Sequence, residues 1–381
     1  MYPGLATVDW DFVGAKTGYL THGFHPYPAK FIPQIPARLI AELSSPGEIV
    51  VDPFCGSGTA LVEAVAAGRS ALGGDVNPVA VVISRAKTLP LNGEDDRDAR
   101  ELADKVQACS EMLSGRLRLM PLSQPDVVVP GDDAIDFWFD PSVARELGVI
   151  NGAIRACRNS KVRLVAKVAL SAIIVSVSKQ DSDTRYVRRE KRLKAGGVAG
   201  RFHAKMIGMV EVLRRLRSNE SLKTEAWVGD ARRLPLAAGS ADLVVTSPPY
   251  PNAYSYHLYH RTRLLWLGFD PQRVKSMEIG SHRHYSARNG ATRSTFKADM
   301  QGCFEELSRV LRSRRYACFV VGNSIIRGEV VDNSRVLEEA GAEVGFNLDD
   351  RFTRNIDMGR KSFNPVIGKI KQEHILLFRA P

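Results

Sequence analysis

The stretch IVVDPFCGSGTALVEAVAAGRSALGGDVNP, residues 49–78, decides the fold. Its first apolar residues end in Asp-Pro and a Gly-rich turn, and an apolar helical run over 60–67 follows. A second apolar run then reaches Asp75. A strand, a helix and a second strand in this order form a βαβ unit, whose strands lie parallel with a right-handed crossover. The stretch therefore predicts an α/β domain with a parallel sheet.

The same pattern returns after a long interruption. From residue 225 onward the stretches EAWVGDARRLP, ADLVVTSPPY, RRYACFVVGNS and EHILLFRA each resemble a strand followed by a turn or the chain end. Between them, residues 91–222 have helical periodicity, as in the apolar stripe at 143, 147, 150 and 154. We expect a doubly wound, mostly parallel sheet made by residues 1–90 and 223–381. Residues 91–222 are expected to form a mainly helical insertion.

Composition indicates a soluble, cytoplasmic protein with a polyanionic partner. The chain has 44% hydrophobic and 25% charged residues, which is ordinary for a globular protein, and a formal net charge of +11. Its N-terminus lacks the basic and apolar regions of a signal peptide. The most apolar run, 162–178, contains Arg163 and Lys167, so a buried helix is expected there and no membrane association. The five cysteines have no metal-ligand spacing, which predicts reduced thiols and no metal site.

The Gly-rich turn at 51–59 has the features of a cofactor site. Gly56 and Gly58 permit a sharp turn and a close backbone approach to a ligand at the start of a helix. Asp75 follows about 20 residues later, where a carboxylate can accept hydrogen bonds from ribose hydroxyls. An ordinary tight turn is the alternative interpretation. A dehydrogenase is disfavoured because the full GxGxxG spacing is absent.

A stiff corner, TSPPY at 246–250, ends another apolar strand. A strand cannot continue through two prolines, because neither has an N–H for the ladder. Such a corner can hold two fixed acceptors, the Ser247 side chain and a nearby backbone carbonyl, against the N–H groups of an exocyclic amine. Tyr250 offers a flat ring on which an extruded base can stack.

These motifs together resemble those of a known family. DPFCGSGT, GDVNP, VGDARRLP and TSPPY, with THGFHPYPAKFIPQIPARLI at 21–40, are similar to motifs of the S-adenosylmethionine-dependent DNA amino-methyltransferases. The resemblance implies the Rossmann-like class I methyltransferase fold and S-adenosylmethionine as cofactor. It implies a catalytic corner at Ser247, Pro248, Pro249 and Tyr250. The implied cofactor-binding residues are His25, Lys30, Asp52, Phe54, Gly56, Gly58, Thr59, Asp75, Asn77 and Asp230.

The methylated atom follows less directly from the motifs. Among relatives of this kind, serine before Pro-Pro is more usual for cytosine N4 and aspartate for adenine N6, so cytosine N4 is favoured. Cytosine C5 methylation is excluded, because its family uses a cysteine directly after a proline and none of the five cysteines here follows one. An adenine-N6 enzyme, an RNA base methyltransferase and a non-catalytic DNA-binding protein remain as alternatives. The long insertion departs from the family pattern, as does the order in which the Gly-rich motif precedes TSPPY.

Duplex DNA is the expected partner, and a companion restriction endonuclease is a further candidate. The insertion, residues 91–222, is the candidate DNA-binding, target-recognition region. Residues 179–217 hold twelve Lys or Arg against four Asp or Glu, which suits contact with phosphates. Within this basic limb the expected DNA contacts are Arg185, Arg188, Arg189, Lys191, Arg192 and Lys194. Tyr254, Tyr256 and His257, just after the corner, are expected to line the pocket of a flipped base or fill the gap it leaves. A second basic stretch, 280–297, is expected to be a mobile loop.

Overall fold

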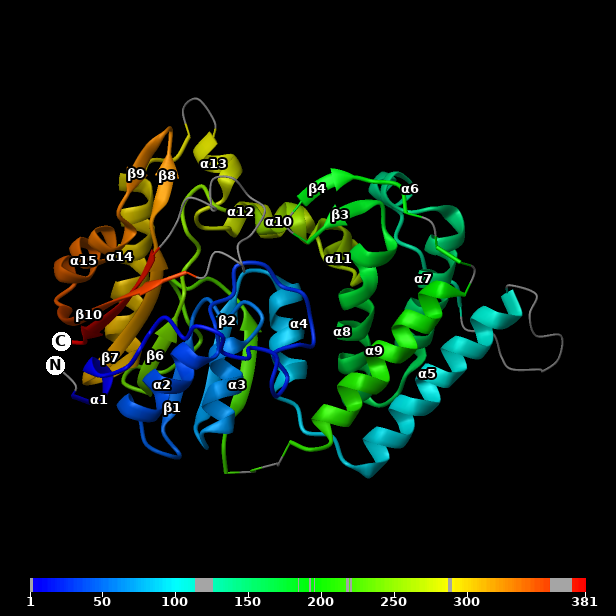
Figure 1. The fold of residues 1–381 in the computed structure, drawn as a ribbon, viewed down its shortest axis with the longest axis horizontal. Helices are drawn as coiled ribbons and strands as arrows, with labels where there is room; N and C mark the ends of the chain where they lie inside the picture. The colour runs from blue at the N-terminus through cyan, green and yellow to red at the C-terminus, as the bar shows by residue number, and fades with distance from the viewer. Residues whose placement is uncertain are drawn as a thin grey trace.

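The computed structural model describes residues 3–113, 126–183, 185–191, 193–194, 196–216, 219, 221–286, 290–356 and 372–381. Figure 1 shows a twisted sheet flanked by helices, next to a bundle of helices. Both ends of the chain contribute to the sheet, whereas the bundle comes from the middle of the sequence. Within the described ranges no helix is long and apolar enough to cross a lipid bilayer.

Seven strands form the sheet in the order β10-β11-β7-β6-β1-β2-β5. They are β1 (Ile49–Asp52), β2 (Ser70–Asp75), β5 (Thr224–Val228), β6 (Ala241–Thr246), β7 (Leu311–Gly322), β10 (Asn347–Asn355) and β11 (Gln372–Arg379). The five strands from β7 to β5 are parallel, whereas β11 runs antiparallel to both of its neighbours. The predicted doubly wound, mostly parallel sheet is confirmed.

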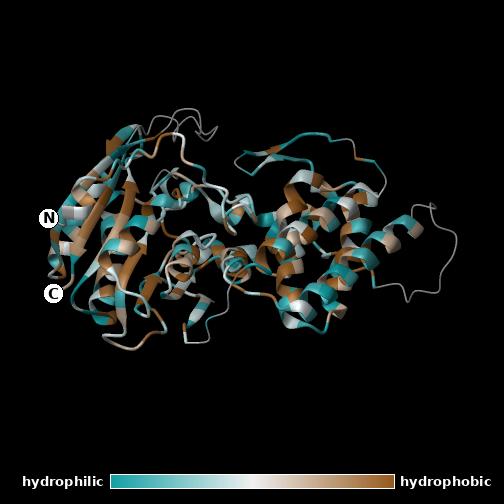
Figure 2. Cartoon of the chain, turned by 60° about the horizontal axis from the view of Figure 1, so that its bottom comes forward, coloured by the Kyte–Doolittle hydropathy of each residue, from teal (hydrophilic) through white to brown (hydrophobic). Residues whose placement is uncertain are grey.

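Helices cover both faces of this sheet, which is why its strands are apolar at successive positions. In β1, Val50 packs in the apolar cluster of α2 and α3, whereas its neighbour Val51 packs in the cluster of α14 and α15. Successive strand residues point to opposite faces, so each face receives its own set. The covering helices are α2 (Gln34–Leu43), α3 (Thr59–Ala66), α14 (Arg293–Val310) and α15 (Asn333–Glu343). Figure 2 shows the hydrophobic colouring along these strands.

The insertion is mainly helical, as the periodicity predicts. Its elements are α5 (Gly93–Leu113), α6 (Asp133–Trp138), α7 (Pro141–Ala156), α8 (Ser160–Val177), α9 (Gly197–Leu213) and the hairpin of β3 (Gln180–Ser182) and β4 (Arg185–Arg188). The stripe at 143, 147, 150 and 154 lies on α7 and is buried. The apolar run at 162–178 forms α8, a buried helix whose inward residues pack on α9.

The bundle shares its apolar core with two elements of the sheet region. Val79 and Ile83 of α4 (Pro78–Lys87) and Leu264 and Trp266 of α11 (Arg261–Trp266) belong to the same buried cluster as α7, α8 and α9. Helix α4 also packs on β2 and β5. The insertion is therefore fixed to the βαβ unit by continuous packing.

Two segments differ from the sequence prediction. The stretch 280–297, expected to be a mobile loop, contains α13 (His282–Ser286) and the start of α14. Tyr285 and Phe296 are buried there, and a capping box of Thr292 and Thr295 begins α14. The basic limb, which charge alone describes as a run of phosphate contacts, contains the β3–β4 hairpin and the start of α9, which Gly196 caps with φ +76°. Both results depend on tertiary packing that a charge pattern does not reveal.

The remaining elements are short. They are α1 (Pro3–Ala6), α10 (Tyr256–Tyr259), α12 (Pro271–Met277) and a hairpin of β8 (Ser324–Ile326) and β9 (Glu329–Val331). Helices α10, α11 and α12 follow the TSPPY corner and contact one another. In Figure 1 they lie between the sheet and the bundle. They are therefore the elements that connect the corner to the insertion.

Candidate active site

A cavity opens at the carboxyl ends of β1, β2, β5 and β6. The sheet order reverses between β1 and β6, because β2 and β5 follow on one side and β7 on the other. Open α/β sheets bind their ligands at such a reversal. Residues singled out from the sequence that line this cavity are Lys30, Phe54, Gly56, Thr59, Asp75, Asn77, Asp230, Ser247, Pro249 and Tyr256.

The two glycines of the turn after β1 have different tasks. Gly56 (φ +47°) lines the cavity, and its N–H donates to Asp75 Oδ2 across 2.9 Å. Gly58 (φ +78°) lies outside the cavity lining, and a Cβ there would meet Ser84 Oγ of α4 at 2.8 Å. Gly58 is therefore required for the close packing of α3 on α4, while Gly56 brings the backbone to the cavity.

Asp75 ends β2 with its carboxylate at the cavity. Its Oδ1 accepts from the N–H of Asn77 at 2.8 Å, and burial raises the pKa of its carboxyl to about 6. Each carboxylate oxygen can accept a second hydrogen bond, so Asp75 can still take hydroxyl hydrogens from a ligand. Asn77 in turn caps α4 by accepting from Val79 N at 3.0 Å.

Asp52 ends β1 and is fully buried. Its Oδ1 accepts from the Thr246 hydroxyl at 2.6 Å and from Phe54 N at 3.1 Å, while Oδ2 is buried without a hydrogen-bond partner in the described part of the chain. Burial raises the pKa of this carboxyl to about 7, although these two hydrogen bonds lower it. Asp52 thus joins the Gly-rich turn to the strand that carries the TSPPY corner.

The TSPPY corner is held from two sides. Tyr250 Oη donates to Glu373 of β11 at 3.1 Å, and burial raises the pKa of this phenol well above its usual value. On the other side Gly280 (φ +75°) packs so closely that a Cβ would lie 3.2 Å from the carbonyl oxygens of Pro249 and Tyr250. Asn252 N also donates to the Gly280 carbonyl at 3.0 Å. The corner is therefore rigid, with Ser247 and Pro249 facing the cavity.

Two further charged residues line the cavity. Asp230 follows β5 and pairs with Arg232 at 2.7 Å. Burial raises the pKa of the Asp230 carboxyl, but the hydrogen bonds and charge of Arg232 outweigh it and hold the pKa below its ordinary value. Lys30 donates from Nζ to the His22 carbonyl at 3.1 Å, and burial lowers the pKa of its ammonium. The cavity thus has a fixed negative charge at Asp230 and a cation at Lys30.

Several predicted site residues lie away from the cavity lining. His25 is buried, and its Nε2 is 2.9 Å from Ser171 Oγ of α8, so the structure places it against the insertion. Pro248 and Tyr250 also lie outside the lining, as do Asp52 and Gly58.

Other lining residues escaped the sequence analysis. Tyr27 and Glu278 line the cavity, and Met277 and Ile279 supply apolar wall next to Glu278. The buried Glu278 carboxylate accepts from Tyr256 N and pairs with His257 Nδ1. Tyr27 lies inside the quoted segment 21–40, but no spacing distinguishes it from its neighbours. Glu278 is more than 200 residues beyond the Gly-rich turn in the sequence, and no local signal links the two.

The predicted DNA contacts divide into exposed and enclosed residues. On the β3–β4 hairpin, the side chains of Arg185, Arg188 and Arg189 are 53%, 43% and 74% exposed. Lys194 is also exposed, and Arg192 lies outside the described residues. Lys191 differs from the prediction, because its ammonium donates inward to the backbone carbonyls of residues 175 and 180.

The residues after the corner differ as well. Tyr254 and His257 are buried, Tyr254 against the rings of Tyr256 and Tyr259, and His257 against Glu278. Of these predicted contacts Tyr256 alone lines the cavity. Within the described ranges no group of three His, Cys, Asp or Glu side chains is arranged to hold a metal ion.

The chain is similar to known DNA methyltransferases. The family described as DNA methylase matches residues 10–85, which include the Gly-rich turn and Asp75. The Type II methyltransferase M.MvaI of Kocuria varians is 24% identical and covers 86% of this chain and 82% of its own length. The Type II methyltransferase M.MjaII of Methanocaldococcus jannaschii is 22% identical, covering 72% of this chain and 68% of its own. The DNA adenine methyltransferase YhdJ of Escherichia coli is 31% identical, over 31% of this chain and 38% of its own.

The fold, the cavity and these matches identify an S-adenosylmethionine-dependent DNA methyltransferase. The predicted resemblance to the DNA amino-methyltransferases is confirmed. Over most of its length this chain is similar to type II DNA methyltransferases.

The cavity fits S-adenosylmethionine chemically. Carboxylates at Asp75 and Asp230 can accept from hydroxyl and amino groups, and the Lys30 ammonium can attract a carboxylate. Ser57 Oγ lines the cavity and is buried without a hydrogen-bond partner among the described residues, so a polar ligand atom can satisfy it. Phe54 supplies apolar surface.

The buried carboxyl of Asp52 predicts a pH-dependent stability. Its pKa is about 7 in the folded protein and near 3.9 when unfolded, so between these values the folded protein binds more protons. The free energy of unfolding should therefore rise as the pH falls from about 7.5 to about 5, by up to about 1.4 kcal/mol per pH unit from this group. Urea unfolding of the wild type and Asp52→Asn across this range measures the difference. Equal pH slopes for the two proteins would show that Asp52 is ionised throughout.

Proposed function

We propose that this protein transfers the methyl group of S-adenosylmethionine to the exocyclic N4 of cytosine in duplex DNA, with the target base flipped out of the helix. The observation that carries the proposal is the position of Ser247. It lies on the cavity wall at the end of β6, in a corner that Asp52, Gly280 and Glu373 hold rigid. A fixed acceptor beside a cofactor cavity suits a reaction at a poorly nucleophilic amino group.

The corner can act on an amino group by holding its two N–H bonds. Ser247 Oγ can accept one, and a backbone carbonyl of the Pro-Pro turn can accept the other, because prolines keep the turn from relaxing. Two such acceptors favour a tetrahedral nitrogen whose lone pair is free to attack. The bound cofactor supplies an electrophilic methyl group on a sulfonium. The rings of Tyr256 and Tyr27 border the same cavity and offer flat surfaces to an extruded base.

Adenine N6 is the second candidate for the methylated atom. The similarity to a protein described as a DNA adenine methyltransferase supports it, although that match extends over 119 residues only. Serine in place of aspartate before the two prolines supports cytosine. A base methyltransferase acting on RNA is a third candidate, and the predominance of DNA methyltransferases among the relatives argues against it.

The first test identifies the product. Expression in a methylation-free host, followed by mass spectrometry of digested nucleic acid, should detect N4-methylcytosine in DNA. Ser247→Ala should lower turnover about a hundred-fold or more while leaving cofactor affinity nearly unchanged, because the acceptor acts as the amino group rehybridises. Ser240→Ala, at the other end of the same strand, is the matched control and should retain activity. Detection of N6-methyladenine alone would replace the cytosine assignment, and modified RNA with unmodified DNA would support the third candidate.

A second test concerns the cofactor. Asp75 is proposed to accept the ribose hydroxyls, Asp230 the adenine amino group, and the turn around Gly56 to contact the methionine portion. Asp75→Asn removes the charge of the acceptor, so the affinity for S-adenosylhomocysteine should fall about ten- to a hundred-fold. Calorimetry measures this, with Glu101→Gln on the exposed surface of α5 as the control. Equal affinity of wild type and Asp75→Asn would remove Asp75 from this role.

The proposed DNA surface is the β3–β4 hairpin. Its three exposed arginines are partly neutralised in the free protein, since Asp181 lies 3.3 Å from Arg185 and 3.4 Å from Arg189, and Glu190 lies 3.1 Å from Arg188. Arg188 also lies over the ring of Phe137 at 5.1 Å. Such surface pairs are weak, so phosphates can take over these guanidinium groups.

A third test measures the salt dependence of DNA binding. Replacing Arg185, Arg188 and Arg189 by alanine should flatten the slope of log affinity against log salt by about 0.9 for each lost phosphate contact. The affinities for specific and for non-specific DNA should fall by about the same factor, because phosphate contacts carry no sequence information. The control is the triple variant of Arg335, Arg351 and Arg379, at α15, β10 and β11, which removes equal charge from the far side of the sheet (Figure 1). An unchanged slope in the hairpin variant would exclude the hairpin as the DNA surface.

A further inference from the structure

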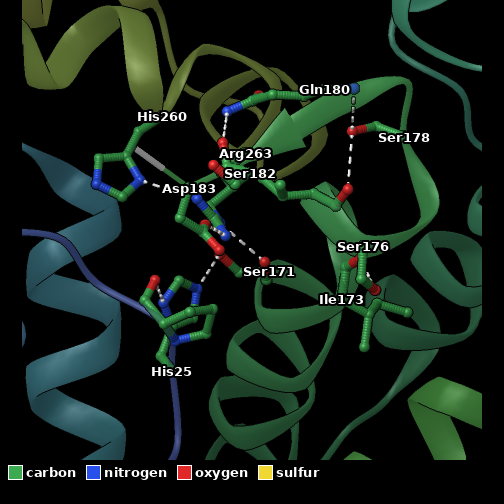
Figure 3. Close-up of polar contacts among 12 residues, drawn as sticks. His25, Ser171, Ile173, Ser176, Ser178, Gln180, Ser182, Asp183, His260 and Arg263 are labelled. Atoms are coloured by element: carbon green, nitrogen blue, oxygen red, sulfur yellow. Dashed lines mark hydrogen bonds and ion pairs between the residues drawn. The ribbon is translucent and has the colours of Figure 1, made fainter. Parts of the chain in front are cut away.

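A largely buried polar cluster lies where three parts of the chain meet (Figure 3). We call it the Arg263 junction, and its members are His25, Ser171, Asp183, His260 and Arg263. His25 belongs to the segment before α2, Ser171 to α8, and Asp183 directly follows β3. His260 and Arg263 come from α11 and the residue that precedes it. The junction therefore joins the insertion to the cofactor region.

Arg263 is the centre of the junction. Its side chain is completely buried, its Nε donates to the Ser171 carbonyl at 3.0 Å, and its Nη2 pairs with the Asp183 carboxylate. Asp183 is the one carboxylate that forms an ion pair with Arg263 among the described residues. A buried guanidinium without a carboxylate is strongly unfavourable, so the position of Arg263 depends on Asp183.

From Arg263 the contacts lead to the cofactor cavity. Arg263 Nη1 lies 3.4 Å from His260 Nδ1. Because a guanidinium can only donate, His260 Nδ1 is the acceptor of this hydrogen bond. The His260 ring stacks on Tyr27 with centroids 4.8 Å apart and an interplanar angle of 25°. Tyr27 lines the cavity, and its Cε1 lies 3.5 Å from where a Cβ of Gly56 would be. One chain of direct contacts thus runs from Asp183 to the cavity wall.

The same segment is also held through His25. Its Nδ1 donates to the Pro26 carbonyl at 2.8 Å, which leaves Nε2 to accept from the Ser171 hydroxyl at 2.9 Å. Ser171 therefore contacts both Arg263 through its carbonyl and His25 through its hydroxyl. Both routes end in the short segment that carries Tyr27.

At its other end the junction reaches the proposed DNA surface. Asp183 lies between β3 and β4, in the hairpin whose Arg185, Arg188 and Arg189 are exposed. The Asp183 side chain itself is 26% exposed. Because Asp183 belongs to the hairpin, the pair between Asp183 and Arg263 depends on where the hairpin lies.

We propose that the Asp183–Arg263 pair couples DNA binding at the hairpin to cofactor binding in the cavity, with Arg263 as a positioning residue for Tyr27. The inference rests on the proposed DNA role of the hairpin. DNA that fixes the hairpin favours the intact pair, which holds His260 against Tyr27 and keeps the cavity wall in place. By thermodynamic linkage the bound cofactor then strengthens DNA binding by the same factor.

The experiment measures this coupling directly. The affinity of the full-length protein for S-adenosylhomocysteine is determined by calorimetry with and without saturating unmethylated plasmid DNA. In the wild type DNA should tighten binding about five-fold or more, which is the lower range of typical couplings. The coupling ratio is the affinity for S-adenosylhomocysteine with DNA divided by the affinity without DNA. In Asp183→Asn, which keeps the shape of the side chain but loses its charge, this ratio should fall to about one. Asp183→Glu restores the carboxylate and should restore most of the coupling.

Asp181→Asn is the matched control. It removes the same charge from the same hairpin, but Asp181 pairs with Arg185 and Arg189 and not with Arg263. Its coupling ratio should equal that of the wild type, whatever its affinity for DNA. If the role of Asp183 were purely structural, Asp183→Asn would lower the affinity for both DNA and S-adenosylhomocysteine and leave the coupling ratio unchanged.

Three outcomes overturn the inference. They are a coupling ratio of one in the wild type, a coupling ratio in Asp183→Asn equal to that of the wild type, and a coupling ratio of one in Asp181→Asn. If Asp183→Asn does not fold, hydrogen exchange of the wild type decides, because DNA should slow exchange in residues 21–30. Unchanged exchange there would overturn the inference too. Failure of the DNA surface itself is distinguishable, since it appears as an unchanged salt slope in the hairpin variant of Arg185, Arg188 and Arg189.

Discussion

The hydrogen bond from Thr246 to Asp52, 2.6 Å long, connects the two halves of the active site. Asp52 begins the Gly-rich turn after β1, and Thr246 is the last residue of β6 before the Pro-Pro corner. The strands are parallel neighbours, so both turns leave the sheet at the same edge. The bond fixes one turn relative to the other. It holds the Asp52 carboxyl in a fully buried position, and this burial raises the pKa of the carboxyl and leaves its second oxygen without a hydrogen-bond partner among the described residues.

Much of the fold and part of the site follow from local sequence. The βαβ unit, the strand before TSPPY and the helices of the insertion each have their own periodicity, so they are predictable one at a time. Gly56, Asp75, Asp230 and Ser247 are predictable for a related reason. Each lies at the carboxyl end of a strand or within a few residues after it, and strands of a parallel sheet bring these ends together whatever lies between them in the chain.

The rest depends on contacts between distant segments. Tyr27 and Glu278 belong to the cavity wall because α4, α11 and the bundle pack as one core, and no residue spacing records that packing. His25 shows the opposite case. It lies in a segment with cofactor-site character, yet its ring turns to Ser171 of the insertion, a residue 146 positions away. Proximity in sequence to a binding motif is therefore a weaker guide than position at the end of a strand.

The charge of the chain illustrates the same limit. A net charge of +11 and a run of basic residues draw attention to the β3–β4 hairpin, but they do not describe its electrostatics. Asp181 and Glu190 already pair with the exposed arginines, and Asp183 pairs with Arg263 inside the protein. A phosphate that binds one of these surface arginines must displace a carboxylate from it. A single phosphate therefore binds weakly, whereas several aligned phosphates bind together more strongly. If the hairpin binds DNA as proposed, these pairs favour an extended polyanion over isolated anions, while Asp183 keeps its pair with Arg263 inside the protein.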